Sequence, residues 1–176
     1  MNIRLAKPGD KIVIANWKTT YKGIIEDRYL QTISVVRRQK MWKEAIEEGY
    51  ETKCLYVVER DRVIIGFATG GSERTNNYRI DDELFAIYIL EEFQGQGIGI
   101  KLFEKVATFL SKKGYNSILV WVLKDNPSYK FYESFQPTLV GTEQIEIGGK
   151  SYEEVAYGWK DIRCLLHVIQ MKRADN

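Results

Sequence analysis

The sequence Leu84-Phe85-Ala86-Ile87-Tyr88-Ile89-Leu90, followed after Glu91-Glu92-Phe93 by Gln94-Gly95-Gln96-Gly97-Ile98-Gly99, decides the fold. Its first part is an unbroken apolar run of strand length, which predicts a strand buried on both faces at the centre of a sheet. Its second part leads into apolar residues at helical spacing, which predict a helix from Ile98 to about Gly114. A strand, a glycine-rich turn and a helix together form an anion site, because the first helical turn leaves N–H groups unpaired. Pyrophosphate is the ligand that this arrangement favours.

Two familiar phosphate-binding motifs do not fit this turn. A Walker P-loop needs Gly-Lys-Ser/Thr, but Ile100 separates Gly99 from Lys101, and Leu102 stands where a magnesium-binding hydroxyl is expected. A dinucleotide fingerprint needs a small residue at 100 and an acidic residue about 20 positions on, where residues 115–117 are Tyr, Asn and Ser. The alternative without a ligand is that the glycines only permit tight packing of strand and helix.

The elements on either side predict a mixed α/β domain. Residues 70–82 are polar and are expected to form a mobile surface loop. Residues 171–176 are expected to form a frayed tail. The remaining predicted elements are a strand at 3–6, a helix opened by Asp10, a helix from Ser34 to Gly49, strands at 54–59, 63–69 and 118–123, a short helix after Asn126-Pro127, and hairpin strands at 138–147 and 152–159.

Composition excludes several classes of protein. The chain has 176 residues, a net charge of +2, one His and two Cys, so it lacks the basic surface that nucleic-acid binding requires. The separated Cys54 and Cys164 and the single His167 indicate no zinc site and no disulfide framework, and we expect no metal. We expect one domain over 1–176, with a core at 2–160 and an extension at 161–176. Without a signal peptide or an apolar run of membrane-spanning length, we expect a cytoplasmic protein that does not enter a membrane.

Two motifs resemble those of the GCN5-related N-acetyltransferase (GNAT) superfamily. Gln94, Gly97 and Gly99 match its acetyl-CoA signature, Gln/Arg-x-x-Gly-x-Gly/Ala after an apolar strand. The segment 126–133, Asn-Pro-Ser-Tyr-Lys-Phe-Tyr-Glu, is similar to its second signature, although Gln136-Pro137 replaces the usual Gly-aromatic ending. The resemblance implies a mixed sheet of about seven strands flanked by about four helices. It also implies transfer of an acetyl group from acetyl-CoA to an amine without a covalent enzyme intermediate.

The resemblance also implies which residues hold acetyl-CoA. Backbone N–H groups of residues 94–99 would bind its pyrophosphate, and its pantetheine arm would pair with residues 87–89 as an extra strand. Asn126 would bind the pantetheine amides, or serve only as a helix N-cap. The expected cofactor-binding residues are Ile87, Tyr88, Ile89, Gln94, Gly95, Gln96, Gly97, Ile98, Gly99, Asn126 and Tyr129.

Two residues are expected to act on protons. Tyr132, from the Phe-Tyr of the second signature, would protonate the departing thiolate, since a phenol is able to donate to that group. The amine must lose a proton before it attacks, and Glu83 is the expected base, with Glu26 or a water chain as alternatives. Each has a simpler interpretation: Tyr132 as a packed core residue, and Glu83 as a solvated member of the acidic run 81–83.

The acceptor is expected to be a small primary amine or a peptide N-terminus. Its pocket would be lined by Trp17, Tyr21 and Glu26, because aromatic rings and a carboxylate suit a cationic amine. Trp17 and Tyr21 are four residues apart, so packing of one helix face explains them equally well. Two other functions remain open, an acyl-CoA-binding sensor without catalysis and a structural interaction module. Apolar residues at 165–169 are expected to dock on the domain or to form a homodimer contact.

Overall fold

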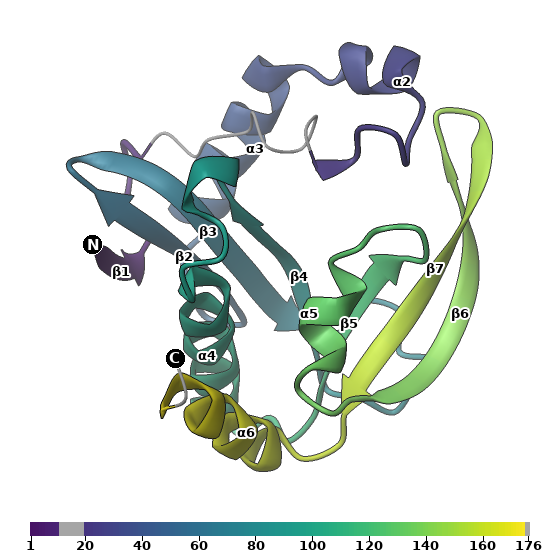
Figure 1. Ribbon diagram of the computed structural model, residues 1–176. Coiled ribbons are helices and arrows are strands. Elements are labelled where there is room, and N and C mark those ends of the chain that lie inside the picture. The colour runs from purple at the N-terminus through teal and green to yellow at the C-terminus, as the bar shows by residue number, and fades with distance from the viewer. Residues whose placement is uncertain (11–19, 175–176) are drawn as a thin grey trace.

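A computed structural model describes residues 1–10 and 20–174 of the chain (Figure 1). A seven-stranded mixed sheet has the strand order β1-β2-β3-β4-β5-β7-β6. Neighbouring strands are antiparallel except β4 and β5, which are parallel. The strands are β1 (Asn2–Leu5), β2 (Lys53–Arg60), β3 (Val63–Ser72), β4 (Asp82–Ile89), β5 (Ile118–Leu123), β6 (Thr138–Ile147) and β7 (Lys150–Trp159).

Helices cover both faces of the sheet (Figure 1). On one face, α4 presents Leu102, Val106 and Leu110 to the largest core cluster, to which α6 adds Leu165 and Ile169. On the other face, Trp42 and Ile46 of α3 pack against β2 and β3, and α2 packs near β5 and the β6–β7 hairpin. The helices are α2 (Asp27–Thr32), α3 (Val35–Glu47), α4 (Ile98–Lys112), α5 (Tyr129–Glu133) and α6 (Ile162–Ala174), with a 3-10 turn at Glu91–Phe93.

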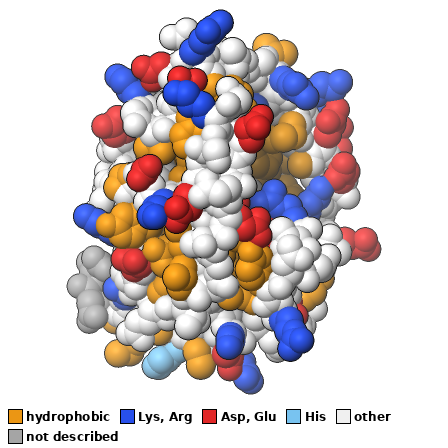
Figure 2. Space-filling model, turned by 90° about the vertical axis from the view of Figure 1, so that its right-hand side faces the viewer, with side chains coloured by type: hydrophobic (Ala, Val, Ile, Leu, Met, Phe, Trp, Pro, Cys, Tyr) orange, Lys and Arg blue, Asp and Glu red, His pale blue; other side chains and the backbone are white. Residues whose placement is uncertain are grey.

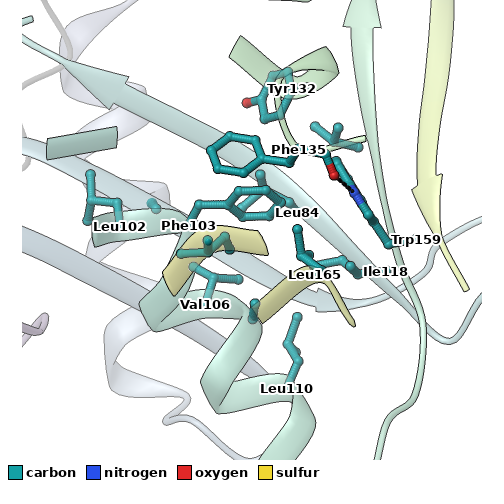
Figure 3. Packing of buried hydrophobic residues seen from close by; sticks show 14 of the residues in the cluster. Leu84, Leu102, Phe103, Val106, Leu110, Ile118, Tyr132, Phe135, Trp159 and Leu165 are labelled. Atoms are coloured by element: carbon teal, nitrogen blue, oxygen red, sulfur yellow. Dashed lines mark hydrogen bonds between the residues drawn. The ribbon is translucent and has the colours of Figure 1, made fainter. Parts of the chain in front are cut away.

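Aromatic rings join the two halves of the sheet within the main core. The ring of Phe103 in α4 makes edge contacts with Tyr132, Phe135 and Trp159, at centroid distances of 6.2, 5.3 and 5.4 Å. Trp159 Nε1 donates a 2.8 Å hydrogen bond to the Phe135 carbonyl, so its polar atom is satisfied inside the core. Figure 3 shows Tyr132 at the edge of this cluster, beside Phe135. This packing fixes α5 against α4.

Most predicted elements are confirmed, and the differences have local causes. The predicted loop over 70–82 is too long, because β3 continues to Ser72 and β4 begins at Asp82. The predicted frayed tail is wrong as far as Ala174, since α6 buries Ile162, Leu165 and Ile169 and continues beyond them. The sequence did not predict α2, which has only six residues. The helix expected after Asp10 lies outside the described residues.

Among the helices of the described ranges, none combines the length and the apolar character that crossing a bilayer requires.

Candidate active site

The parallel strands β4 and β5 pair over only three positions and then separate. Asp82, Glu83 and Leu84 pair with residues 118–120, and no pairing continues beyond Leu84. At that point β4 carries a bulge, because Gly70 of β3 pairs with Leu84 whereas the preceding residue pairs with Ala86. Phe85 is therefore the extra residue, and a bulge of this kind bends its strand. The edge of β4 that faces β5 is open where the strands separate.

The bulge also changes which side chains face which layer. Leu84, Ile87 and Ile89 contact the core on the α4 side, whereas Ala86 and Tyr88 contact the cluster on the α3 side. Without the extra residue, strict alternation from Leu84 would place Ala86 on the α4 side. Each face of the separated strand therefore has its own set of side chains.

A cavity of about 690 Å³ lies along the open edge of β4. It is bounded by three segments: the end of β4, the turn that opens α4, and the segment that opens α5. Nine of the expected cofactor-binding residues line it, together with Tyr132. The nine are Ile87, Tyr88, Ile89, Gln94, Gly95, Gly97, Ile98, Gly99 and Asn126.

The glycine-rich turn has the backbone geometry of an anion cradle. Gly95 and Gly97 have φ of +71° and +70°, which L side chains rarely adopt, and a Cβ on either glycine would meet no other atom within 4 Å. A hydrogen bond from the Lys101 N–H to the Gly97 carbonyl, 3.4 Å long, opens the helix. The N–H groups before it are the unpaired donors of a helix start. The turn therefore fits a pyrophosphate, because glycine leaves open the space around these donors.

Two contacts hold the turn in place. The side chain of Gln94 donates a 2.9 Å hydrogen bond from Nε2 to the Ile89 carbonyl, which ties the turn to the end of β4. A Cβ on Gly99 would lie 3.2 Å from the ring of Phe131, so this glycine allows α5 to pack closely against α4. Gly99 thus has a packing role, whereas Gly95 and Gly97 have a conformational one.

Asn126 and Tyr132 lie on the far side of the cavity from β4. Asn126 is buried, and its Oδ1 accepts a 2.9 Å hydrogen bond from the Ser128 N–H. Asn126 thus closes a turn before α5 but is not the N-cap of that helix, which is Ser128. Tyr132 is 7% exposed. Burial, with a smaller effect from Tyr21, raises the pKa of Tyr132 well above its usual value. The phenol therefore keeps its proton at neutral pH.

Two further tyrosine hydroxyls meet at the separation of the strands. The hydroxyls of Tyr21 and Tyr88 are 3.2 Å apart. Burial raises the pKa of Tyr88 well above 10, and Tyr132 acts in the same direction. Tyr88 contacts the cluster on the α3 side and also lines the cavity. The Tyr21–Tyr88 pair therefore lies where the cavity meets the α3 side of the sheet.

The structure gives both predicted acidic residues a cationic partner. Glu83 is 1% exposed, so its interpretation as a solvated residue is wrong. Its Oε2 accepts a 3.0 Å hydrogen bond from Arg74 Nε, and its Oε1 pairs with the same guanidinium. Glu26 is exposed and forms a 2.6 Å ion pair with Lys150, the first residue of β7. Trp17 lies outside the described residues.

Two expected cofactor-binding residues lie outside the cavity lining. Gln96 is exposed and donates from Nε2 to the Glu92 carbonyl at 3.2 Å. Tyr129 packs against the main core instead. The sequence did not single out the other lining residues. All of them except Thr20 lie in or next to the two motifs, which was a usable signal. They are Thr20, Glu91, Phe93, Ile100, Pro127, Ser128 and Phe131.

Comparisons with known proteins agree with this fold and cavity. The sequence profile of the Acetyltransferase (GNAT) family matches residues 17–136. The chain is 36% identical over 156 residues to an uncharacterized N-acetyltransferase, YuaI, of Bacillus subtilis (strain 168), a match that covers 88% of this chain and 87% of that protein. The chain therefore belongs to the GNAT family and is an acetyl-CoA-dependent acetyltransferase.

Solved structures share the fold at low sequence identity. A ribosomal-protein-alanine N-acetyltransferase from Brucella melitensis superposes with a TM-score of 0.66 at 18% identity, covering 91% of this chain and 99% of that one. The PaiA N-acetyltransferase from Thermoplasma acidophilum, in complex with coenzyme A, gives 0.60 at 19% identity, with coverage of 91% and 99%. These likenesses confirm the predicted acyltransferase fold.

Proposed function

We propose that this acetyltransferase moves the acetyl group of acetyl-CoA directly to a primary amine, either a small molecule or a peptide N-terminus. The observation that carries the proposal is the cavity of about 690 Å³. It joins the anion cradle at Gly95 and Gly97 to a protonated phenol, Tyr132, along the end of β4. A covalent intermediate is not required in this arrangement, because the acceptor can reach the acetyl group from the open side of the gap.

The backbone would provide most of the cofactor binding. N–H groups of residues 95–99 would hold the pyrophosphate, whereas the Gln94 N–H already donates to the Glu91 carbonyl at 3.1 Å. The open edge of residues 87–89 would pair with the pantetheine amides. Asn126 borders the same cavity. Bound acetyl-CoA supplies an activated thioester, and an N–H near Ile87 or Tyr88 would stabilise negative charge on its carbonyl oxygen.

Tyr132 would donate its proton to the sulfur as CoA leaves. Its high pKa keeps the phenol protonated, so Tyr132 holds a proton that it can donate as negative charge develops on the sulfur. The edge contact with Phe103, at 88° between ring planes, fixes the phenol ring in the cavity wall. Its location supports the proposed acid role without excluding its packing role.

A screen for free CoA tests the proposed function. Acetyl-CoA and the purified protein are mixed with polyamines, aminoglycosides, amino acids or N-terminal peptides, and free thiol is measured. We expect release with at least one amine class, and Tyr132→Phe should lower kcat about tenfold or more while the Kd for acetyl-CoA stays within about twofold. Tyr129→Phe is the matched control on the same short helix. Binding of acetyl-CoA without release over the whole panel would instead support the sensor function.

A further inference from the structure

We propose that Glu154 in β7 binds the ammonium group of the acceptor and takes its proton, in place of Glu83 or Glu26. The inference rests on the proposed amine acetylation and assigns a catalytic residue to it. Glu154 pairs across the sheet with Leu123, the last residue of β5. Glu154 therefore lies beside the end of β5. From that end the chain continues to Asn126, which lines the cavity.

Sheet register places Glu154 on the acceptor side. In β7, Glu154 lies two residues from Tyr152, which belongs to the apolar cluster with Tyr21 and Leu123 on the α2 side. Alternate residues of a strand share a face, so the Glu154 side chain shares this side. Figure 2 views the molecule from the β6–β7 hairpin and shows a hollow beside it, with hydrophobic side chains inside and charged ones at its edge. An amine that enters there approaches the gap from the side opposite α4.

Glu154 differs from the other carboxylates on this side because its side chain has no partner in the part of the chain that the structure describes. Glu83 is bound by Arg74 through both oxygens, and Glu143 accepts a 2.5 Å hydrogen bond from the hydroxyl of Tyr78. Glu26 is paired with Lys150. The half-buried Glu154 carboxylate has neither a hydrogen bond nor an ion pair with any residue in the described ranges. The Glu154 carboxylate therefore keeps both oxygens available for a cation, whereas each of the other three already has a hydrogen bond or an ion pair.

Charges around Glu154 make it a suitable proton acceptor. Burial raises its pKa, and the Glu143 and Glu83 carboxylates from β6 and β4 raise it further, while the Arg74 guanidinium opposes them. The phenols of Tyr21 and Tyr78 also face it, since the Glu154 charge raises the pKa of each. A carboxylate whose pKa is raised toward neutrality is a better general base than one at its ordinary value.

The proton balance of the reaction follows from these positions. One ammonium proton passes to Glu154 and then to solvent, which frees the nitrogen lone pair. The C–N bond forms as the C–S bond breaks, the nitrogen gives a second proton to Glu154, and the sulfur receives a proton from Tyr132. Tyr132 recovers its proton from solvent, so each turnover releases one proton net.

The test compares Glu154→Gln with Glu153→Gln, using whichever amine releases most CoA in the screen. Glu153 is the matched control because it is adjacent in the same strand, points to the other face and is paired with Lys124 at 2.9 Å. We expect Glu154→Gln to lower kcat at neutral pH by about 100-fold and to make kcat rise steadily with pH, as solvent takes over deprotonation of the amine. Glu153→Gln should keep the wild-type profile.

The outcomes separate this assignment from the proposed function. If wild type releases CoA and Glu154→Gln keeps the wild-type kcat and pH profile, the role of Glu154 is refuted and the acetylation stands. If wild type neither binds acetyl-CoA nor releases CoA with any amine, both proposals fall. An unchanged Kd for acetyl-CoA and an unchanged unfolding midpoint in Glu154→Gln show that a loss of kcat is not a loss of fold.

Discussion

Replacing Asp82 with asparagine is expected to stabilise the protein at neutral pH and to remove a pH dependence of its stability. Asp82 lies at the start of β4 between Ser72 and Ile118 and is 0% exposed. Neither of its carboxylate oxygens has a hydrogen-bond partner among the described residues. Burial, assisted by the Asp81 carboxylate, raises its pKa from 3.8 to about 7. The folded protein therefore keeps this carboxyl protonated at a pH at which the unfolded chain has lost the proton.

The direction and size of the effect follow from that difference. Where the folded state holds the extra proton, the free energy of unfolding decreases as pH rises, by up to about 1.4 kcal/mol per pH unit. With a pKa of 3.8 in the unfolded chain and about 7 in the fold, Asp82 costs about 4 kcal/mol at pH values above about 7. Asparagine has nearly the same shape and no charge to bury, so Asp82→Asn removes this cost.

Urea unfolding of wild type and Asp82→Asn, followed by tryptophan fluorescence, measures the difference directly. We expect the stability advantage of the variant to grow by about 3 kcal/mol between about pH 5 and about pH 8. Asp61→Asn is the control, because it removes an exposed carboxylate from the β2–β3 turn. If the free energy of unfolding depended on pH in the same way for wild type and Asp82→Asn, the raised pKa of the buried Asp82 carboxyl would be refuted.

Three further substitutions test the turn, a helix cap and the hairpin. Gly97→Ala should weaken acetyl-CoA binding about tenfold in calorimetry, whereas Gly114→Ala, with the same left-handed strain at the other end of α4, should leave affinity unchanged. Ser34→Ala should lower the free energy of unfolding by about 1 kcal/mol in urea, because Ser34 caps α3. Gly148→Ala should lower the melting temperature more than Gly149→Ala. Both substitutions place a side chain on left-handed backbone, but only the Cβ at 148 would meet a ring of α2, at 2.7 Å from Tyr29.

The elements that could be predicted from the sequence are those with strong local signals. The apolar run 84–90 predicted β4, and the run 118–123 predicted β5 with the bounds that the structure has. The periodic residues after Ile98 predicted α4. In each case the apolar pattern lies within one contiguous segment, so it is visible without knowledge of its neighbours.

The elements that could not be predicted depend on distant partners. In α2 only Leu30 is buried and no side chain caps the first turn, so neither periodicity nor a cap marks it. The bulge at Phe85 leaves no mark in an all-apolar run. The cofactor side of the site was accessible from sequence because residues 94–99 are contiguous. The side on which we place the acceptor was not, since the position of Glu154 depends on the pairing of β7 with β5, and Glu83 is paired with Arg74 of the preceding loop.

The bulge at Phe85 lets one strand present different side chains to the two layers that cover it. Ile87 and Ile89 face the layer that holds the cofactor signature, while Ala86 and Tyr88 face the layer in which we place the acceptor. A substitution at Ile87 or Ile89 therefore changes the cavity on the α4 side, whereas a substitution at Tyr88, which faces the α3 side and also lines the cavity, changes both surroundings. We therefore expect substitutions at Ala86 and on the same face of β7 to change acceptor preference before they change acetyl-CoA binding.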